Sequence, residues 1–221
     1  MAQTVNGSPR RDPDFAFERV FWRIGLRAVA GVDEVGRGAL AGPLVAAAVV
    51  FPARRGNAIA RLASDLDGVR DSKLLTPIRR VALLETIHAA AVAVGVGMTD
   101  SVELDAIGLA AANRIAMERA VLALPDEPDA LLLDACTIDL GMPQVGPIDA
   151  DAHCLSVAAA SIVAKVTRDA LMVAADAIEP RYGFAGHKGY GSAFHLAMLG
   201  EHGPCPLHRR SFAPVARYIV Q

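Results

Sequence analysis

The feature that most constrains the fold is a run of consecutive apolar residues, Leu44–Phe51, which lies between Pro43 and Pro52. The run is far shorter than the roughly 18 residues that begin to suggest a membrane span, and it is typical of a buried β-strand. A second apolar run, 28–33, precedes it, and the glycine-rich segment 36–38 lies between the two. We therefore expect two neighbouring buried strands joined by a glycine-rich turn.

Segments with helical character alternate with further short apolar runs along the rest of the chain. Thr76 and Pro77 are typical of a helix N-cap and a first helical position, and the sequence 100–103 resembles a capping box. Strands separated by helices indicate an α/β fold. We expect helices over 76–92, 101–124 and 155–178, and further strands over 91–98, 130–134 and 145–149.

Charge divides the chain into regions that its net charge of -2 conceals. Residues 181–221 carry five basic residues against one acid, Glu201, a local charge of +4. We expect a flexible N-terminal tail over 1–14, an α/β core over 15–180, and a basic, mainly helical extension of the same domain over 181–221. The net charge excludes a uniformly basic nucleic-acid binder, but a local basic face remains available at the C-terminal end.

The cysteines and the start of the chain indicate a compartment. There are 3 cysteines, an odd number, and the N-terminal sequence has no apolar run of the kind that directs secretion. We expect a cytoplasmic protein without a membrane partner.

Acidic residues follow two of the expected strands and precede the longest expected helix. Asp33 and Glu34 end one strand, Asp134 ends another, and Asp149 and Asp151 lie just before residue 155. Each acid alone is at least as well explained as a solvated strand end, a turn residue or a helix cap. If the sheet brings them together, they would repel one another unless cations neutralise them, and oxygen-only ligands favour Mg²⁺ or Mn²⁺. The pattern thus indicates a metal site.

Two other spacings are weaker. His202, Cys205 and His208 have a zinc-like spacing but supply only three ligands. Ser161 and Lys165 do not match the spacing of an acylating serine, which leaves them as residues on one helix face.

Six sequence motifs, in order over residues 28–213, resemble the ribonuclease HII family, the type 2 ribonucleases H. The motifs are Ala30-Gly31-Val32-Asp33-Glu34-Val35-Gly36-Arg37-Gly38, Asp71-Ser72-Lys73, the strand ending in Asp134, the segment from Asp151 through Ser161 and Lys165 to Asp169, His187-Lys188-Gly189-Tyr190-Gly191, and His208-Arg209-Arg210-Ser211-Phe212.

The resemblance implies an RNase H-like mixed β-sheet flanked by helices, with a small, mainly helical C-terminal part. It also implies an endoribonuclease that hydrolyses the RNA strand of RNA–DNA hybrids and incises 5′ of single ribonucleotides in duplex DNA. Two divalent ions, Mg²⁺ or Mn²⁺, would act in catalysis, which gives 3′-hydroxyl and 5′-phosphate products. The four catalytic carboxylates, which are also the metal ligands, map onto Asp33, Glu34, Asp134 and Asp151. Ala150 stands where many members have glycine, so Asp149 is a rival for the last position.

The same resemblance implies how substrate is bound. The turn formed by Gly36, Arg37 and Gly38 would recognise the 2′-hydroxyl, and Tyr190 would pack on the sugar of the following deoxynucleotide. Candidates for phosphate contacts are Lys73, Lys165, Lys188, Arg209 and Arg210, of which Lys73 and Lys188 are favoured. The partners would be RNA–DNA hybrid and ribonucleotide-containing duplex DNA, bound by a monomer that serves ribonucleotide excision repair and DNA replication.

Two alternatives remain open. One is another metal-dependent nuclease of the same fold, such as a resolvase, and the other is a nucleic-acid-binding module that has lost its chemistry. Cleavage of DNA without ribonucleotides would favour the first, and absence of metal-dependent cleavage would favour the second.

Overall fold

A five-stranded mixed sheet forms the centre of the protein, whose computed structural model describes residues 12–219. Residues 1–11 of the predicted tail therefore lie outside the described residues. The strands lie in the order β3-β2-β1-β4-β5; β1 is antiparallel to β2, β2 is antiparallel to β3, and β4 is parallel to both β1 and β5. The strands are β1 (Val29–Val35), β2 (Leu44–Val50), β3 (Ala93–Thr99), β4 (Ala130–Leu133) and β5 (Gln144–Val145).

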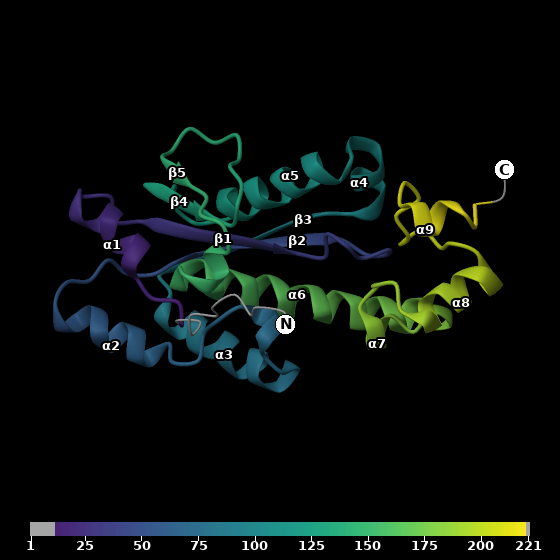
Figure 1. Cartoon of the computed structure of the whole chain (residues 1–221), viewed down its shortest axis with the longest axis horizontal. Coiled ribbons are helices and arrows are strands. Elements are labelled where there is room, and N and C mark those ends of the chain that lie inside the picture. Colours follow the sequence, from purple (N-terminus) through teal and green to yellow (C-terminus); the bar gives the residue numbers. More distant parts are fainter. Residues whose placement is uncertain (1–11, 220–221) are drawn as a thin grey trace, which may run out of the picture.

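Helices cover both faces of this sheet, as Figure 1 shows with the sheet almost edge-on. The long helix α6 and α3 lie on one face, and α4 and α5 lie on the other. The helices are α1 (Ala16–Arg23), α2 (Asn57–Asp65), α3 (Pro77–Ala90), α4 (Ser101–Ile107), α5 (Leu109–Leu122), α6 (Leu155–Ile178), α7 (Phe184–His187), α8 (Ala193–His202) and α9 (Ala213–Ala216), with short 3₁₀ turns at η1 (Ser72–Leu74), η2 (Ala150–Ala152) and η3 (Pro180–Tyr182).

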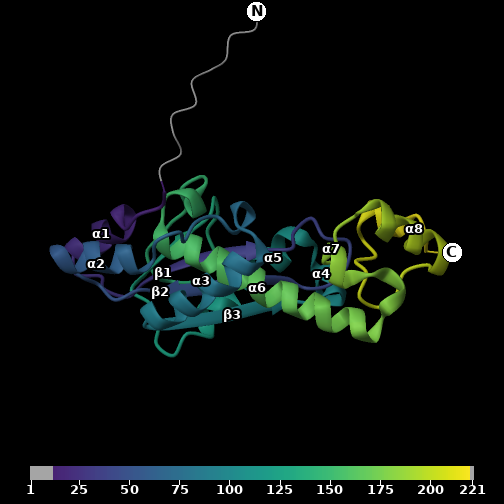
Figure 2. The ribbon, with the colours of Figure 1, turned by 90° about the horizontal axis from the view of Figure 1, so that it is seen from below.

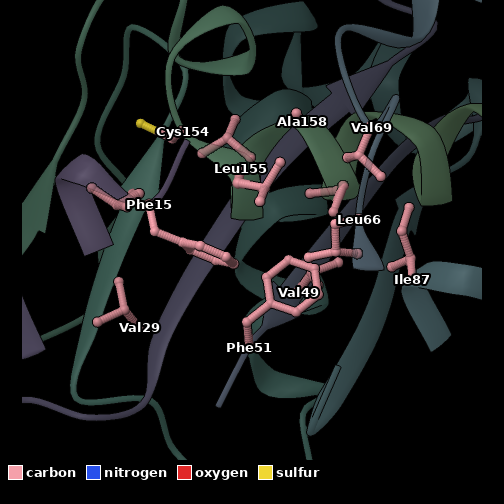
Figure 3. Packing of buried hydrophobic residues seen from close by; sticks show 14 of the residues in the cluster. Phe15, Val29, Val49, Phe51, Leu66, Val69, Ile87, Cys154, Leu155 and Ala158 are labelled. Atoms are coloured by element: carbon pink, nitrogen blue, oxygen red, sulfur yellow. The ribbon is translucent and has the colours of Figure 1, made fainter. Parts of the chain in front are cut away.

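Two apolar layers hold the helices to the sheet. Because successive strand residues face opposite sides, alternate residues of the wholly buried strand β2 enter different layers: Val49 packs toward α6, and Val50 packs toward α5. Figure 3 shows the first layer, where Phe15 lies near Phe51 and Leu155. A strand buried on both faces explains why its sequence has no polar side chain.

The C-terminal residues gather at one end of the molecule, around the far end of α6 (Figures 1 and 2). A separate apolar cluster joins Met172 of α6 to Tyr182, Phe184 and Cys205. The C-terminal extension thus shares a hydrophobic cluster with α6, which also packs on the sheet. We propose that the boundary between the core and this extension lies at residue 180.

Most of the expected elements are confirmed, and the expected mixed sheet flanked by helices is present. The expected single helix over 101–124 is wrong, because Gly108, at φ +82°, separates α4 from α5. The strand expected over 145–149 is only the short β5, and α1 and α2 were not predicted. Within residues 12–219, every helix is too short or too polar to cross a lipid bilayer.

Candidate active site

Parallel pairing of β1 with β4 brings acids that are distant in sequence to one place. Val32 lies opposite Leu133, so the residues that follow them, Asp33 and Asp134, come side by side at the end of the pair. Glu34 is the next residue of β1, and Asp151 lies in η2, immediately before α6. The four predicted carboxylates thus surround one edge of the sheet.

Two cavities meet at these acids, and Lys73 and Asp134 line both of them. The larger, of about 600 Å³, is also lined by Asp33, Glu34 and the segment from Gly36 to Gly38. The smaller, of about 300 Å³, includes Asp151 and the rival acid Asp149. Asp149 is exposed, whereas Asp151 is 6% exposed.

Burial and mutual repulsion make Asp33, Glu34 and Asp151 costly to ionise. Burial raises the pKa of Asp33 well above its usual value, and the neighbouring charges of Glu34 and Asp151 raise it further. Burial also raises the pKa of Glu34, partly offset by Arg37, and raises the pKa of Asp151, with a further contribution from Asp71. Such groups are stabilised as carboxylates by cations held among them.

The protein itself supplies some of the compensating contacts. Lys73 Nζ lies 3.7 Å from Asp151 and 3.9 Å from Asp71, and Arg37 lies 3.4 Å from Glu34. Burial lowers the pKa of Lys73, but the surrounding carboxylates outweigh this and raise it overall. The Asp134 carboxylate accepts a hydrogen bond of 2.8 Å from the Ala150 N–H group, which ties β4 to η2.

The donor chemistry of this cluster fits hard divalent cations, since every acidic ligand is an oxygen. In the part of the chain that the structure describes, no three histidine, cysteine or acidic side chains converge into a ready-made cation cage. In this structure Glu34, Asp151 and Asp134 contact the partners just named. The zinc-like trio gathers no site either: His208 contacts the backbone N–H of Cys205 and the ring of His195.

Two buried arginines hold the glycine turn beside the acids. Arg168 donates to the carbonyl groups of Ala41, Pro43 and Lys188, and a Cβ atom at Gly36, whose φ is +96°, would lie 2.3 Å from its Nε. Arg209 donates to the carbonyl groups of Gly42 and Arg37. Arg209 is 0% exposed and shapes the turn from inside, and the phosphate contact predicted for it stays a prediction.

The remaining predicted substrate contacts divide between the cavity and other surfaces. Tyr190 and Lys165 line the larger cavity with the acids, although the Lys165 ammonium is bound to Asp169 at 2.8 Å. Lys188 does not join them: its ammonium contacts the Ala185 carbonyl, and it lines a separate groove between α3 and α6. Only Lys73 among the predicted lysines lies within the acid cluster.

Several residues at the site were not predicted as functional. The Ser161 hydroxyl donates to the Ser72 hydroxyl at 2.8 Å and accepts from the Ser72 N–H group at 3.3 Å, which brings α6 and η1 together behind the acids. The Arg168 guanidinium lies 5.3 Å from the Tyr190 ring. Ser161 and Arg168 are seven residues apart on α6 and therefore lie on one face of the helix. This spacing can be seen in the sequence.

A mixed sheet with carboxylates gathered beside a glycine turn is the arrangement that the sequence resemblance predicts for a nuclease of the ribonuclease H class. The sequence profile described as Ribonuclease HII matches residues 30–215. The chain belongs to the ribonuclease HII family and is a hydrolase of the ribonuclease H kind.

Individual relatives agree with this assignment. The Ribonuclease HII of Chloroflexus aurantiacus is 48% identical over 94% of this chain and 97% of its own length. The crystal structure of ribonuclease H2 from Pyrococcus horikoshii OT3 is similar with a TM-score of 0.71 and 27% identity, over 86% of this chain and 96% of that one. Bst-RNase HIII, solved in complex with Mn²⁺, shares the fold with a TM-score of 0.65 and 21% identity, over 89% of this chain and 70% of that one.

Proposed function

We propose that this protein is an endoribonuclease that hydrolyses the RNA strand of RNA–DNA hybrids and incises 5′ of single ribonucleotides embedded in duplex DNA. The observation that carries the proposal is the larger cavity, where Asp33, Glu34 and Asp134 face the Gly36–Gly38 turn and the Tyr190 ring. A phosphodiester next to a ribose could meet the acids and a sugar-sensing surface at the same time.

Asp33, Glu34, Asp134 and Asp151 would hold two divalent ions, Mg²⁺ or Mn²⁺. When bound, the ions supply neutralisation of the charge that develops at the scissile phosphate and activation of water at neutral pH. Manganese in the related Bst-RNase HIII supports this choice of ion. The raised pKa values of Asp33, Glu34 and Asp151 mean that ionising the site and loading it with cations are coupled.

The chain's own groups position the substrate. Backbone groups of the turn would approach the 2′-hydroxyl closely, because glycine leaves the approach open, and this hydroxyl distinguishes RNA from DNA. The Tyr190 ring, 37% exposed, would pack on the sugar of the following deoxynucleotide. Lys73, and the exposed Arg210 outside the cavity, would contact phosphates and fix the register of the duplex.

Other parts of the proposal concern the protein's setting. The three free cysteines, two buried and one half-buried, are consistent with a reducing cytoplasm. We propose that the protein acts as a monomer in ribonucleotide removal and DNA replication.

Cleavage of paired duplexes tests the proposal. One duplex carries a single ribonucleotide and the other is all DNA, and each is incubated with and without Mg²⁺ or Mn²⁺. We expect metal-dependent incision 5′ of the ribonucleotide and none of the all-DNA duplex. Cleavage of both would indicate the resolvase-type alternative, and binding without cleavage would indicate a non-catalytic module.

A matched pair of variants tests the acid cluster. Asp134→Asn removes one charged ligand and is expected to lower the cleavage rate by at least about 10³-fold while duplex binding survives. Asp126→Asn makes the same chemical change at an exposed residue remote from both cavities, and its rate should equal that of the parent protein. If Asp134→Asn loses binding and thermal stability together with activity, the residue is structural.

A further inference from the structure

Three histidine rings lie directly behind Tyr190, in the C-terminal part of the chain. His195 and His208 are 0% and 1% exposed, and the half-buried His187 stacks on His195 with ring centroids 4.4 Å apart. The rings of Tyr182 and Phe184 pack against His208. Such complete burial is unusual for histidine unless its ring nitrogens are bonded.

The hydrogen bonds of these rings have one consistent direction. His208 Nδ1 accepts from the Cys205 N–H group at 3.0 Å, so the His208 proton lies on Nε2. That Nε2 lies 3.0 Å from His195 Nε2, which must accept, leaving the His195 proton on Nδ1. Nδ1 lies 2.9 Å from the Tyr190 carbonyl oxygen, which can only accept. Both rings are therefore neutral, in opposite tautomers.

Hydrogen bonds and close packing hold the segment next to Tyr190 in place. Gly189, at φ +81°, packs against Ala41, where an added Cβ would lie 2.3 Å from the carbonyl oxygen. The Gly189 N–H group donates to His187 Nδ1, and its carbonyl accepts from the N–H groups of Leu40 and Ala41. The loop is thus fixed at residues 187 and 189. The Tyr190 N–H group donates to the His187 carbonyl, and the Tyr190 carbonyl accepts from the Ser192 N–H group at 2.8 Å and from His195, whose bond is the one made by a side chain.

We propose that His195 and His208 are positioning residues: their chain of hydrogen bonds, from the Cys205 N–H group to the Tyr190 carbonyl, holds the Tyr190 ring at the cavity and so sets selectivity for single ribonucleotides. This inference rests on the proposed function, in which Tyr190 packs on a deoxyribose. On a substrate whose next sugar is a ribose, the ring contributes less, so its placement matters less.

This series of hydrogen bonds forms only while both histidine rings are neutral. Burial lowers the pKa of His195, and burial together with His195 lowers the pKa of His208 to about 4. Two cations also lie nearby: Arg168 is beside the Tyr190 ring, and Arg209 is the residue after His208. The titratable groups around the two histidines are His187, Tyr182, Cys205 and Glu179. Both rings are therefore neutral at pH 7, and the series of hydrogen bonds is complete.

Amide substitutions at His195 test which of its ring nitrogens donates to the Tyr190 carbonyl. Asparagine places an amide near the Nδ1 position and can still donate to the Tyr190 carbonyl, whereas glutamine places its amide near Nε2 and loses that bond. The measurement is the ratio of kcat/KM on a single-ribonucleotide duplex to that on a long hybrid. We expect His195→Gln to lower this ratio roughly tenfold, the effect of one lost positioning bond, and His195→Asn to stay within about twofold of the parent.

A double variant and a spectroscopic readout complete the test. Tyr190→Ala should lower the same ratio, and His195→Gln should add nothing in a Tyr190→Ala background if it acts through that ring. Additive losses, or equal ratios for His195→Asn and His195→Gln, would overturn the inference.

The ¹⁵N spectrum of labelled histidines is independent of activity. It should show His208 protonated at Nε2 and His195 at Nδ1, and the reverse tautomers would also overturn the inference. If the parent protein shows this pattern yet cleaves neither substrate, the proposed function fails while the hydrogen-bond chain stands.

Discussion

Adjacent arginines 209 and 210 have opposite surroundings, and this gives a prediction at the scale of single residues. Arg209 is buried and donates to two backbone carbonyl groups, whereas the side chain of Arg210 is exposed. Arg209→Ala leaves those carbonyls unpaired, so we expect the free energy of unfolding to fall by about 3 kcal/mol. Urea denaturation measures this loss.

Arg210→Ala is the matched control for that substitution. It should change the free energy of unfolding by less than about 0.5 kcal/mol but weaken duplex binding, with a shallower dependence of affinity on salt. Equal stability losses in both variants would contradict the distinction between a clamp and a phosphate contact.

The contrast between these arginines shows what the sequence reveals about the site. The strand ends and motifs predicted that Asp33, Glu34 and Asp134 lie together, because residues in the last part of a buried strand or directly after it have little choice of place. They did not predict that Arg209 points inward or that Lys188 faces another groove. Long side chains reach several ångströms in any direction, and tertiary packing decides which direction they take.

Glu18 of α1 gives a prediction about pH. Its buried carboxylate accepts from the N–H and hydroxyl groups of Ser156, yet burial raises its pKa from 4.5 to about 7. Because the folded state holds this proton more tightly than the unfolded state, the contribution is fully present below pH 4.5 and is lost as the pH rises through 7. The loss amounts to about 3 kcal/mol.

Glu18→Gln imitates the protonated form and should escape this loss. Relative to the parent protein, the variant should therefore gain about 3 kcal/mol in unfolding free energy between pH 5 and pH 8, measured by urea denaturation. Glu85→Gln removes a carboxylate from the exposed surface of α3 and should follow the parent at both pH values. A pH-independent difference for Glu18→Gln would show that its ionisation does not matter.

At the scale of secondary-structure elements, local patterns predicted the long segments and missed the short ones. The helix α3 has the Thr76 cap and Pro77 that the sequence indicated, with the Thr76 hydroxyl accepting from the Arg79 N–H group. The helices α1 and α2 have no side-chain cap and are held by buried residues such as Trp22 and Leu62. Short helices depend on tertiary packing, which a single sequence does not display.

The contact between β3 and α5 depends on glycine. A Cβ atom at Gly97 would lie 2.3 Å from the Ala116 carbonyl oxygen and the Ala120 nitrogen, both in the backbone of α5. Gly97→Ala should therefore push the helix from the sheet and lower the melting temperature by roughly 8 °C or more, since backbone cannot yield as a flexible side chain does. Gly141→Ala, where an added Cβ meets nothing within 4 Å, should leave the melting temperature unchanged.

At the scale of the whole molecule, the acid cluster links stability to divalent ions. Ions that bind the folded site relieve repulsion among carboxylates whose pKa values are raised, so Mg²⁺ or Mn²⁺ should raise the melting temperature and chelation should reverse the rise. At a hundred times the dissociation constant the gain is about 2.7 kcal/mol. Thermal denaturation over a metal series measures it.

Asp134→Asn should reduce the metal-induced rise, whereas Asp126→Asn should keep it. An undiminished rise in Asp134→Asn would mean that the ions bind elsewhere.

The parallel pairing of β1 with β4 also sets the order in which a growing chain assembles its acid cluster. During synthesis Asp33 and Glu34 emerge early, but they have no neighbour until Asp134 and then Asp151 leave the ribosome. The rings of His195 and His208, which contact each other, are synthesised later still. The acid cluster therefore cannot assemble until β4 and η2 have been synthesised, about a hundred residues after β1.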